Sequence, residues 1–186
     1  MRKTSEKLIV LDLEATCWDG TVPAGEQSEI IEIGICELDT KKLSITQSHS
    51  FLIKPTRSTV SAFCTKLTSI TAEMLNEQGI TFTEAIQQIL DLYKPQRITW
   101  ASWGDYDRNM LKQSCTLENT IYPFGKTHLN IKSAAALLLG ERERGMLQLL
   151  EQLQIPHEGT HHRGLDDALN IAKIWAVLCS RMRANM

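Results

Sequence analysis

Apolar and polar positions divide the chain into a first region of strands and a second region dominated by helices. Lys7–Leu13 is a short run rich in leucine and β-branched residues, which predicts a buried strand. Residues 30–38 alternate like a second strand, and residues 43–53 resemble a third. The stretch 39–42 between them is short and polar, as expected of a hairpin turn.

Helical periods begin after Pro55. Residues 61–66 and 71–76 predict short helices, each with a hydroxyl residue placed to cap its start. Residues 82–93 carry the apolar stripe of an amphipathic helix, and residues 97–101 return to a strand. Further helices are expected at 105–115, 131–139, 146–153 and 165–178, the last being the longest and packing across the sheet.

This order of elements indicates an α/β fold with an antiparallel hairpin in a mixed sheet. A length of 186 residues suits one domain, so we predict a single domain over residues 1–186.

The apolar fraction of 42% and charged fraction of 23% are ordinary for a globular protein. A net charge of −2 marks no basic nucleic-acid-binding face. An acidic site filled by divalent cations would, however, be less negative than its residues suggest.

The five cysteines are scattered and form no C-x-x-C pair. An odd number without a secretory signal indicates reduced thiols, so we expect a cytoplasmic location. The N-terminal segment lacks the long apolar stretch of a signal peptide. No segment approaches the roughly 20 apolar residues of a membrane-spanning helix.

Two acidic residues, Asp12 and Glu14, end the first apolar run. Side chains two positions apart share a strand face, so two carboxylates stand side by side at the edge of an apolar core. Burying both charges is costly and is usually relieved by a cation or a raised pKa. Oxygen ligands at this spacing suit magnesium or manganese. The alternative is that both side chains project into solvent from a one-sided strand, although the surrounding leucine and valine residues indicate a strand that is apolar on both faces.

His161, His162, Asp166 and Asp167 lie at the approach to the longest predicted helix. The two aspartates flank the apolar stripe of that helix on opposite sides, so helical geometry leaves the choice between them open. A histidine beside a carboxylate at a helix start can act as a base next to a metal. The alternative is that the aspartates stabilise the helix dipole and the histidines are ordinary loop residues.

Asp105 and Asp107 lie where a predicted strand joins a helix through Gly104. In α/β sheets, ligands usually bind where a strand leads into a helix. Asp105 has the position of a helix cap, and Asp107 lies in the first turn. Capping and dipole compensation are therefore the alternative to a role as metal ligands.

Together, Asp12-Leu-Glu14, the segment around Asp107 and His162-Arg-Gly-Leu-Asp-Asp167 resemble the three signature blocks of the DEDDh exonuclease superfamily, in that family's order. Further similarity is to the branch of bacterial KapD and the histone-mRNA stem-loop exonucleases, in FLIKP (51–55), LTSIT (67–71), LNIK (129–132) and residues 158–175. The resemblance covers nearly the whole chain. It implies an RNase H-like fold, a mixed central sheet flanked by helices.

The resemblance also selects among the open alternatives. The family pattern H-x4-D pairs His162 with Asp167, in place of His161 with Asp166, and the second aspartate of the central motif selects Asp107. His162 is then the general base. The implied ligands of two Mg²⁺ or Mn²⁺ ions are Asp12, Glu14, Asp107 and Asp167.

Substrate contacts are implied as well. Tyr106 stands where the family has a tryptophan that stacks on the terminal base, and Phe63 and Leu67 match positions near the terminal nucleotide. Core packing is the alternative for Phe63 and Leu67. The implied activity is a 3′→5′ exonuclease that releases nucleoside 5′-monophosphates from single-stranded nucleic acid, with RNA favoured. A DNA-directed exonuclease and a regulatory protein that binds an unidentified protein partner are the alternatives.

Overall fold

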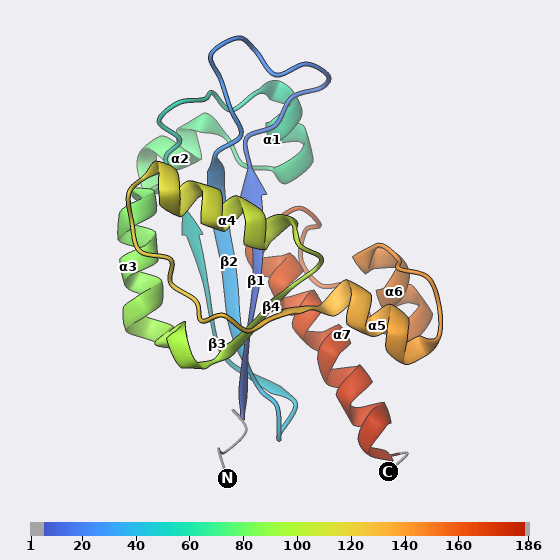
Figure 1. Cartoon of the computed structure of the whole chain (residues 1–186). Helices are drawn as coiled ribbons and strands as arrows, with labels where there is room; N and C mark the ends of the chain where they lie inside the picture. Colours follow the sequence, from blue (N-terminus) through green and yellow to red (C-terminus); the bar gives the residue numbers. More distant parts are fainter. Residues whose placement is uncertain (1–5, 185–186) are drawn as a thin grey trace.

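The computed structural model describes residues 6–184. Its strands are β1 (Lys7–Ala15), β2 (Ile30–Asp39), β3 (Ser44–Leu52), β4 (Thr99–Ser102) and β5 (His128–Asn130). They form one five-stranded sheet in the order β3-β2-β1-β4-β5 (Figure 1). The pairs β1–β2 and β2–β3 are antiparallel, whereas β1–β4 and β4–β5 are parallel. The predicted mixed sheet is therefore confirmed.

The α-helices of the described chain are α1 (Ala62–Thr68), α2 (Ala72–Gln78), α3 (Phe82–Tyr93), α4 (Tyr106–Leu117), α5 (Ile131–Leu139), α6 (Met146–Leu153) and α7 (Gly164–Ala184). Helices α3 and α4 cover one face of the sheet, and α5, α6 and α7 cover the other. The short helices α1 and α2 lie near the end of the sheet where β1 finishes (Figure 1). None of the described helices is both long enough and apolar enough to span a membrane.

The predicted elements match the structure with three exceptions. Helix α7 was predicted to end at Leu178 but continues to Ala184. Ser61 and Thr71 cap α1 and α2 as expected, because their side chains accept hydrogen bonds from backbone N–H groups of the first turns. Arg97 was predicted to begin a strand but ends the 3-10 turn Pro95–Arg97. Strand β5 was not predicted, because three residues are too short to show a period. The single domain over residues 1–186 stays a prediction, and it includes residues 1–5 of the N-terminal segment, which lie outside the described range.

Strands β1 and β2 form the interior of the sheet. Leu8 and Val10 pack towards α7, while Ile9 and Leu11 pack towards α3 and α4, which confirms that the first strand is apolar on both faces. Strand β2 is also covered on both faces, and its exposed fraction is 0% at Glu32. An alternating pattern is typical of a half-buried strand. Here the polar positions are buried as well, because they bind partners inside the molecule.

Helix α7 crosses the sheet and starts in direct contact with the backbone of β2. A Cβ atom built on Gly34 would lie 1.9 Å from the carbonyl carbon of Gly164. Further along the helix, the thiol of Cys36 approaches the carbonyl oxygen of Ala168 at 3.6 Å. Glycine at position 34 is therefore required for the close approach that fixes where α7 begins.

We expect Gly34→Ala to lower the free energy of unfolding by at least about 2 kcal/mol, because overpacking of backbone against backbone has no flexible side chain to relieve it. Chemical denaturation measures the change. Gly145→Ala is the matched control, since a Cβ there meets its nearest atom at 3.6 Å. That control should change stability by less than about 1 kcal/mol. Equal stability of Gly34→Ala and the wild type would contradict the close contact.

Candidate active site

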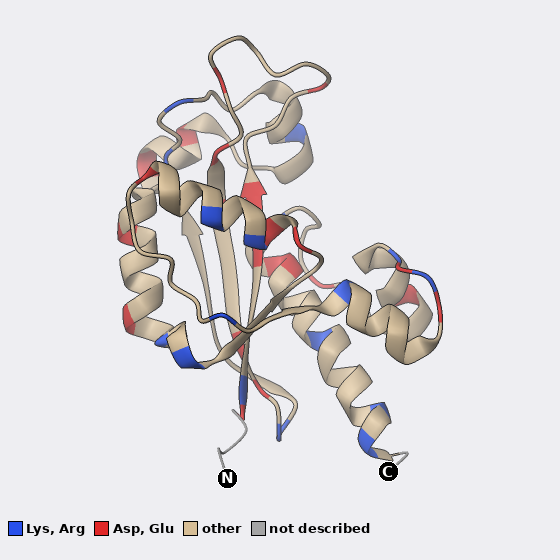
Figure 2. Ribbon diagram, in the orientation of Figure 1, with Lys and Arg blue, Asp and Glu red and all other residues tan. Residues whose placement is uncertain are grey.

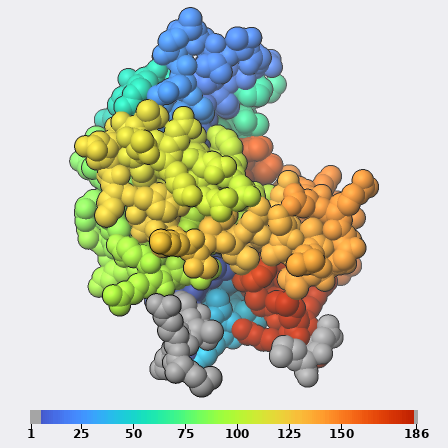
Figure 3. All heavy atoms as spheres, in the orientation of Figure 1, coloured from blue at the N-terminus to red at the C-terminus, as the bar shows by residue number. Residues whose placement is uncertain are grey.

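A cavity of about 400 Å³ opens at the end of β1, beside the starts of α4 and α7. Figure 2 shows acidic segments of these three elements converging. In Figure 3 the surface is hollowed between the N-terminal part of the chain (blue) and the α5–α6 region (orange). The cavity is lined by all the residues predicted to be catalytic: Asp12, Glu14, Asp107, His162 and Asp167. Residues far apart in the sequence therefore meet at one place.

Three of the four carboxylates lie within mutual reach. Oxygen atoms of Asp12, Glu14 and Asp167 all lie within 4.8 Å of one another. Glu14 and Asp167 are buried, with 7% and 4% of their surface exposed, so the acidic pair on β1 does not simply project into solvent. The fourth carboxylate, Asp107, is buried next to β1, where its Oδ1 accepts a hydrogen bond from the backbone N–H of Leu13 at 3.1 Å.

Burial raises the pKa values of Glu14, Asp107 and Asp12. It raises the pKa of Glu14 to about 8, with neighbouring carboxylates adding to the rise. It raises the pKa of Asp107 to about 7, although hydrogen bonds from Leu13 and Ser102 lower it. For Asp12, burial and then the charge of Asp107 raise the pKa well above 3.8. Such a group of oxygen ligands takes up protons or a hard divalent cation to relieve its charge.

The two aspartates at the start of α7 have different surroundings. Asp167 joins the carboxylate group in the cavity. Asp166 turns to the preceding loop, where it accepts the backbone N–H of Thr160 at 2.7 Å. A Cβ atom on Gly159 would overlap the Asp166 carboxylate, so this side chain fills the turn. The choice that helical geometry left open is thus made by the loop, in favour of Asp167 as the cavity residue.

The two aspartates near the start of α4 also separate. Asp105 occupies the N-cap position of α4, as predicted. Its side chain, however, makes no capping hydrogen bond to the backbone of the helix, so the predicted capping contact is wrong. Its carboxylate binds Arg108 at 2.9 Å and accepts a hydrogen bond from Asn130 at 3.2 Å. Asp107 faces the cavity instead. Capping therefore does not describe Asp107.

Both histidines line the cavity but contact different carboxylates. The Nδ1 atom of His161 lies 3.0 Å from Asp167 Oδ2, whereas Nδ1 of His162 lies 3.9 Å from Glu14 Oε1. The backbone N–H of His162 donates to Asp167 Oδ2 at 3.0 Å, so this predicted pair meets through the main chain. Burial and the neighbouring His161 lower the pKa of His162. The His162 ring is therefore neutral at pH 7 and able to accept a proton.

Exposed apolar side chains border the cavity. Tyr106 and Leu67 line it and are 58% and 37% exposed. Phe63, which is 38% exposed on α1, does not line it. Core packing is therefore wrong for Phe63 and Leu67, and their contact with a nucleotide stays a prediction. Lys132, at the start of α5, is the only lysine or arginine among the described residues that line the cavity.

Two residues that were not singled out in the sequence lie next to the carboxylates. Glu32 is fully buried and lies directly opposite Glu14 in the pairing of β1 with β2. Arg163 binds it, with 3.0 Å between Nε and Oε2. The sequence did contain a signal for this pair, namely an acidic residue inside the apolar run 30–38. A charge buried in a strand requires a partner of opposite charge.

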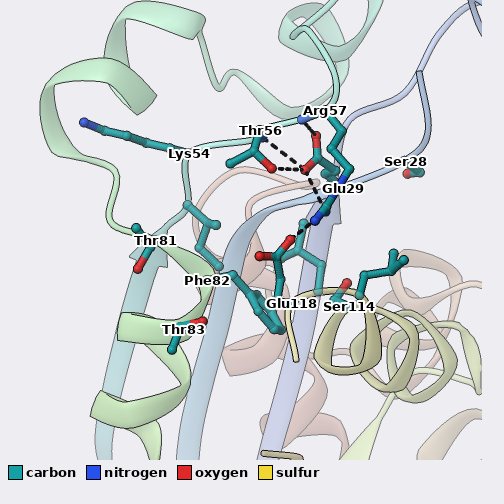
Figure 4. A pocket seen from close by; sticks show the side chains of 13 residues that line it. Ser28, Glu29, Lys54, Thr56, Arg57, Thr81, Phe82, Thr83, Ser114 and Glu118 are labelled. Atoms are coloured by element: carbon teal, nitrogen blue, oxygen red, sulfur yellow. Dashed lines mark hydrogen bonds and ion pairs between the residues drawn. The ribbon is translucent and has the colours of Figure 1, made fainter. Parts of the chain in front are cut away.

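A second cavity, of about 120 Å³, lies between α3, the end of α4 and the segment after β3 (Figure 4). Three of its charged side chains, Glu29, Arg57 and Glu118, form one group. Arg57 binds Glu118 at 2.5 Å and lies 3.7 Å from Glu29, which also accepts backbone N–H groups of Thr56 and Arg57. No group of metal-ligating side chains lies there in the described part of the chain.

Comparison with known proteins identifies the family of the chain. Residues 9–175 match the sequence model of the family RNase_T, described as exonuclease. The 3′-5′ exoribonuclease 1 of Homo sapiens is 33% identical over 180 residues, covering 90% of this chain and 50% of that protein. The probable 3′-5′ exonuclease KapD of Bacillus subtilis is 27% identical over 179 residues, covering 94% and 85%. The chain spans about half the length of the human relative and of its Rattus norvegicus counterpart.

Solved structures show the same fold. The nuclease domain of 3′hExo, a DEDDh family member bound to rAMP, superimposes with a TM-score of 0.85 at 27% identity, covering 98% of this chain and 94% of that chain. A 3′-exonuclease solved for its 3′-end-specific recognition of histone mRNA stem-loop gives 0.85 at 27% identity, covering 95% and 64%. The RNase H-like fold expected from the sequence is therefore confirmed.

The raised pKa of Glu14 predicts that it destabilises the metal-free protein as pH rises. Folded protein keeps the Glu14 proton up to a pKa of about 8, whereas the unfolded chain loses it near the ordinary value of 4.5. Between these values the folded state binds more protons, so this contribution to stability is present at low pH and is lost as pH approaches 8.

Melting temperatures in a chelating buffer at pH 5, 6.5 and 8 test this. The stability of Glu14→Gln relative to the wild type should increase with pH. Comparing the variant with the wild type separates the effect of Glu14 from that of His162. The lowered pKa of His162 makes the protein more stable as pH rises, which is the opposite direction. Glu77→Gln, an exposed position on α2, should show no such trend. A Glu14→Gln difference that is independent of pH would contradict the raised pKa.

Proposed function

The chain belongs to the exonuclease family whose sequence model it matches, and we propose that it removes nucleoside 5′-monophosphates from the 3′ end of single-stranded RNA. The observation that carries this proposal is the buried group of carboxylates from β1 and α7, with Asp107 and two histidines in the same cavity. RNA is favoured over DNA because the human relative is named an exoribonuclease and the solved neighbours contain rAMP or recognise an mRNA stem-loop.

Exonucleases of the DEDDh family use divalent metals, and the donor set here fits such ions. Asp12, Glu14 and Asp167 offer only oxygen atoms, which suit Mg²⁺ or Mn²⁺, and we propose that they hold two of these ions with the help of Asp107. When bound, the ions polarise the phosphodiester and acidify a water molecule. Without a cation, burial favours the protonated forms of Glu14 and Asp107, because it raises their pKa values to about 8 and about 7.

The side chains around the carboxylates divide the remaining work. The neutral ring of His162 is 39% exposed at the cavity, so it can take the proton of the attacking water as general base. The exposed ring of Tyr106 provides a surface on which the terminal base can stack. Lys132 provides the positive charge that a phosphate group requires at an otherwise acidic cavity. These roles remain proposals for this chain.

The state of the cysteines bears on the cellular location. All five cysteines carry free thiols, which supports a reducing compartment such as the cytoplasm. Binding of a regulatory protein partner is the competing function. The intact group of buried carboxylates favours catalysis, since a binding protein has no need to keep these charges together.

We expect Asp12→Ala and His162→Ala to remain folded and to lose at least about 100-fold in activity, the usual contribution of a metal ligand or a general base. Asp107→Asn should also be impaired. Asp105→Asn is the matched control, because this neighbouring aspartate binds Arg108 and lies outside the cavity lining. Rates of shortening of a 5′-labelled oligoribonucleotide provide the measurement. Near-wild-type activity of purified Asp12→Ala would sink the proposed chemistry.

Substrate choice is tested with single-stranded RNA and DNA of the same sequence, each labelled at its 5′ end. We expect stepwise shortening of RNA from the 3′ end, slower shortening of DNA, and loss of both in EDTA because the carboxylates then lack their ions. Excess Mg²⁺ or Mn²⁺ should restore activity. Equal rates on both substrates would remove the RNA preference, and shortening that persists in EDTA would remove the metal from the proposal.

A further inference from the structure

The turn that carries His162 has an uncommon backbone conformation. Its φ angle is +64°, in the left-handed region that residues with a Cβ atom rarely adopt because of steric crowding. Such a conformation persists only where the surroundings hold it in place. The contacts of the residues on either side of His162 therefore matter for where its ring lies.

Glu32 provides the contacts that follow His162 in the chain. This fully buried carboxylate binds Arg163 through Nε at 3.0 Å and Nη2 at 3.3 Å, and it accepts the backbone N–H of Gly164 at 2.9 Å. Ser50, on β3, donates a further hydrogen bond at 2.6 Å. One side chain of β2 thus holds the two residues that come directly after His162.

Asp167 and the backbone of β2 hold the turn as well. Asp167 accepts the backbone N–H of His162 at 3.0 Å, and the backbone of Gly164 touches that of Gly34. Glu32 is paired with Glu14 across β1 and β2, so the strand pairing that places Glu14 also places the anchor of the turn. The distance between the His162 ring and Glu14 therefore depends on the same two strands.

We propose that Glu32 and Arg163 are positioning residues: the buried Glu32 and the half-buried Arg163 form an ion pair that holds the His162 turn at a fixed place relative to Asp12 and Glu14. This inference rests on the proposed function, because it assigns a purpose to the position of the general base. Glu32 is not itself a ligand. It lies outside the metal-binding groups found among the described residues, and its oxygens already accept four hydrogen bonds.

Stability alone is a poor explanation of this pair. Desolvating two charges costs as much as their attraction returns, and apolar residues often replace buried ion pairs without loss of stability. The ion pair instead fixes the orientation of Arg163, because the planar guanidinium donates two N–H groups to the Glu32 carboxylate. An anchor of this kind defines the orientation of the adjacent main chain.

The decisive comparison is Glu32→Gln against Glu37→Gln. Both glutamates are buried on β2, and Glu37 also has its own partners, Lys7 at 3.0 Å and Thr46 at 2.7 Å. Glutamine at position 32 keeps an acceptor for Gly164 but removes the charge that orients Arg163. Steady-state rates on a 5′-labelled oligoribonucleotide with Mg²⁺, at a temperature where both variants are folded, separate the maximal rate from KM.

We expect Glu32→Gln to lower kcat by about 10- to 100-fold with little change in KM, as is usual when a residue behind an active group is lost. Glu37→Gln should keep the kcat of the wild type even if its melting temperature falls. Equal kcat values for Glu32→Gln and the wild type would overturn the proposal. So would an equal loss in both variants, because that would reflect stability alone.

Hydrogen exchange of the segment 160–167 gives a readout that needs neither metal nor activity. We expect faster exchange there in Glu32→Gln and in Arg163→Met, partial recovery in Arg163→Lys, and no change in Glu37→Gln. Unchanged exchange in both Arg163→Met and Glu32→Gln would overturn the anchor even if the protein is a nuclease. A wild type that shortens no RNA would instead overturn the proposed function, and the exchange data would still decide whether the pair holds the turn.

Discussion

The contact between α7 and β2 is the constraint on which the rest of the molecule depends. Gly34 and Gly164 meet backbone to backbone, so the helix can begin at only one place on the sheet. That place puts Asp167 in the first turn of α7 beside the two acids of β1. Side chains any larger at the contact would move the helix away and separate the three carboxylates. The packing of Gly34 against Gly164 therefore also brings the three carboxylates together.

The site is a region where folding and function oppose each other. Hydrophobic burial of β1 on both faces stabilises the sheet, yet the same burial raises the pKa of Asp12, Glu14 and Asp107. Within the molecule, Arg163 is bound to Glu32 and Lys132 lies 3.6 Å from Glu143. The charge of the carboxylates is therefore relieved by protons or by cations from solution, which explains why a metal-dependent chemistry suits this fold.

Sequence patterns predict the fold well and the site in part. The bounds predicted for α3, α5 and α6 agree with the structure, and those of α3 follow from a clear apolar stripe. Asp12 and Glu14 stand out because acids interrupt an apolar strand. Asp167 and Asp166 do not differ in helical periodicity, and only the loop at Gly159, which takes up Asp166, separates them. Contacts between residues distant in the chain settle such choices.

The buried partner of Arg163 escaped prediction for a related reason. In the run 30–38, Glu32 looks like one polar position of an alternating strand, and its meaning depends on a guanidinium 131 residues later. Likewise, the expected cap of α4 was assigned to Asp105 from position alone, whereas Arg108 and Asn130 compete for that carboxylate. Local rules place these side chains, and tertiary neighbours decide what they bind.

Asp167 also bears on the order in which the protein is made. Strand β1, with the first two carboxylates, emerges from the ribosome early, but the carboxylate that completes the group belongs to α7, the last helix of the described chain. Contacts of such large sequence separation form late in folding. A nascent chain therefore has no complete site while its mRNA is still being translated. The proposed nuclease site is complete only after synthesis has passed Asp167.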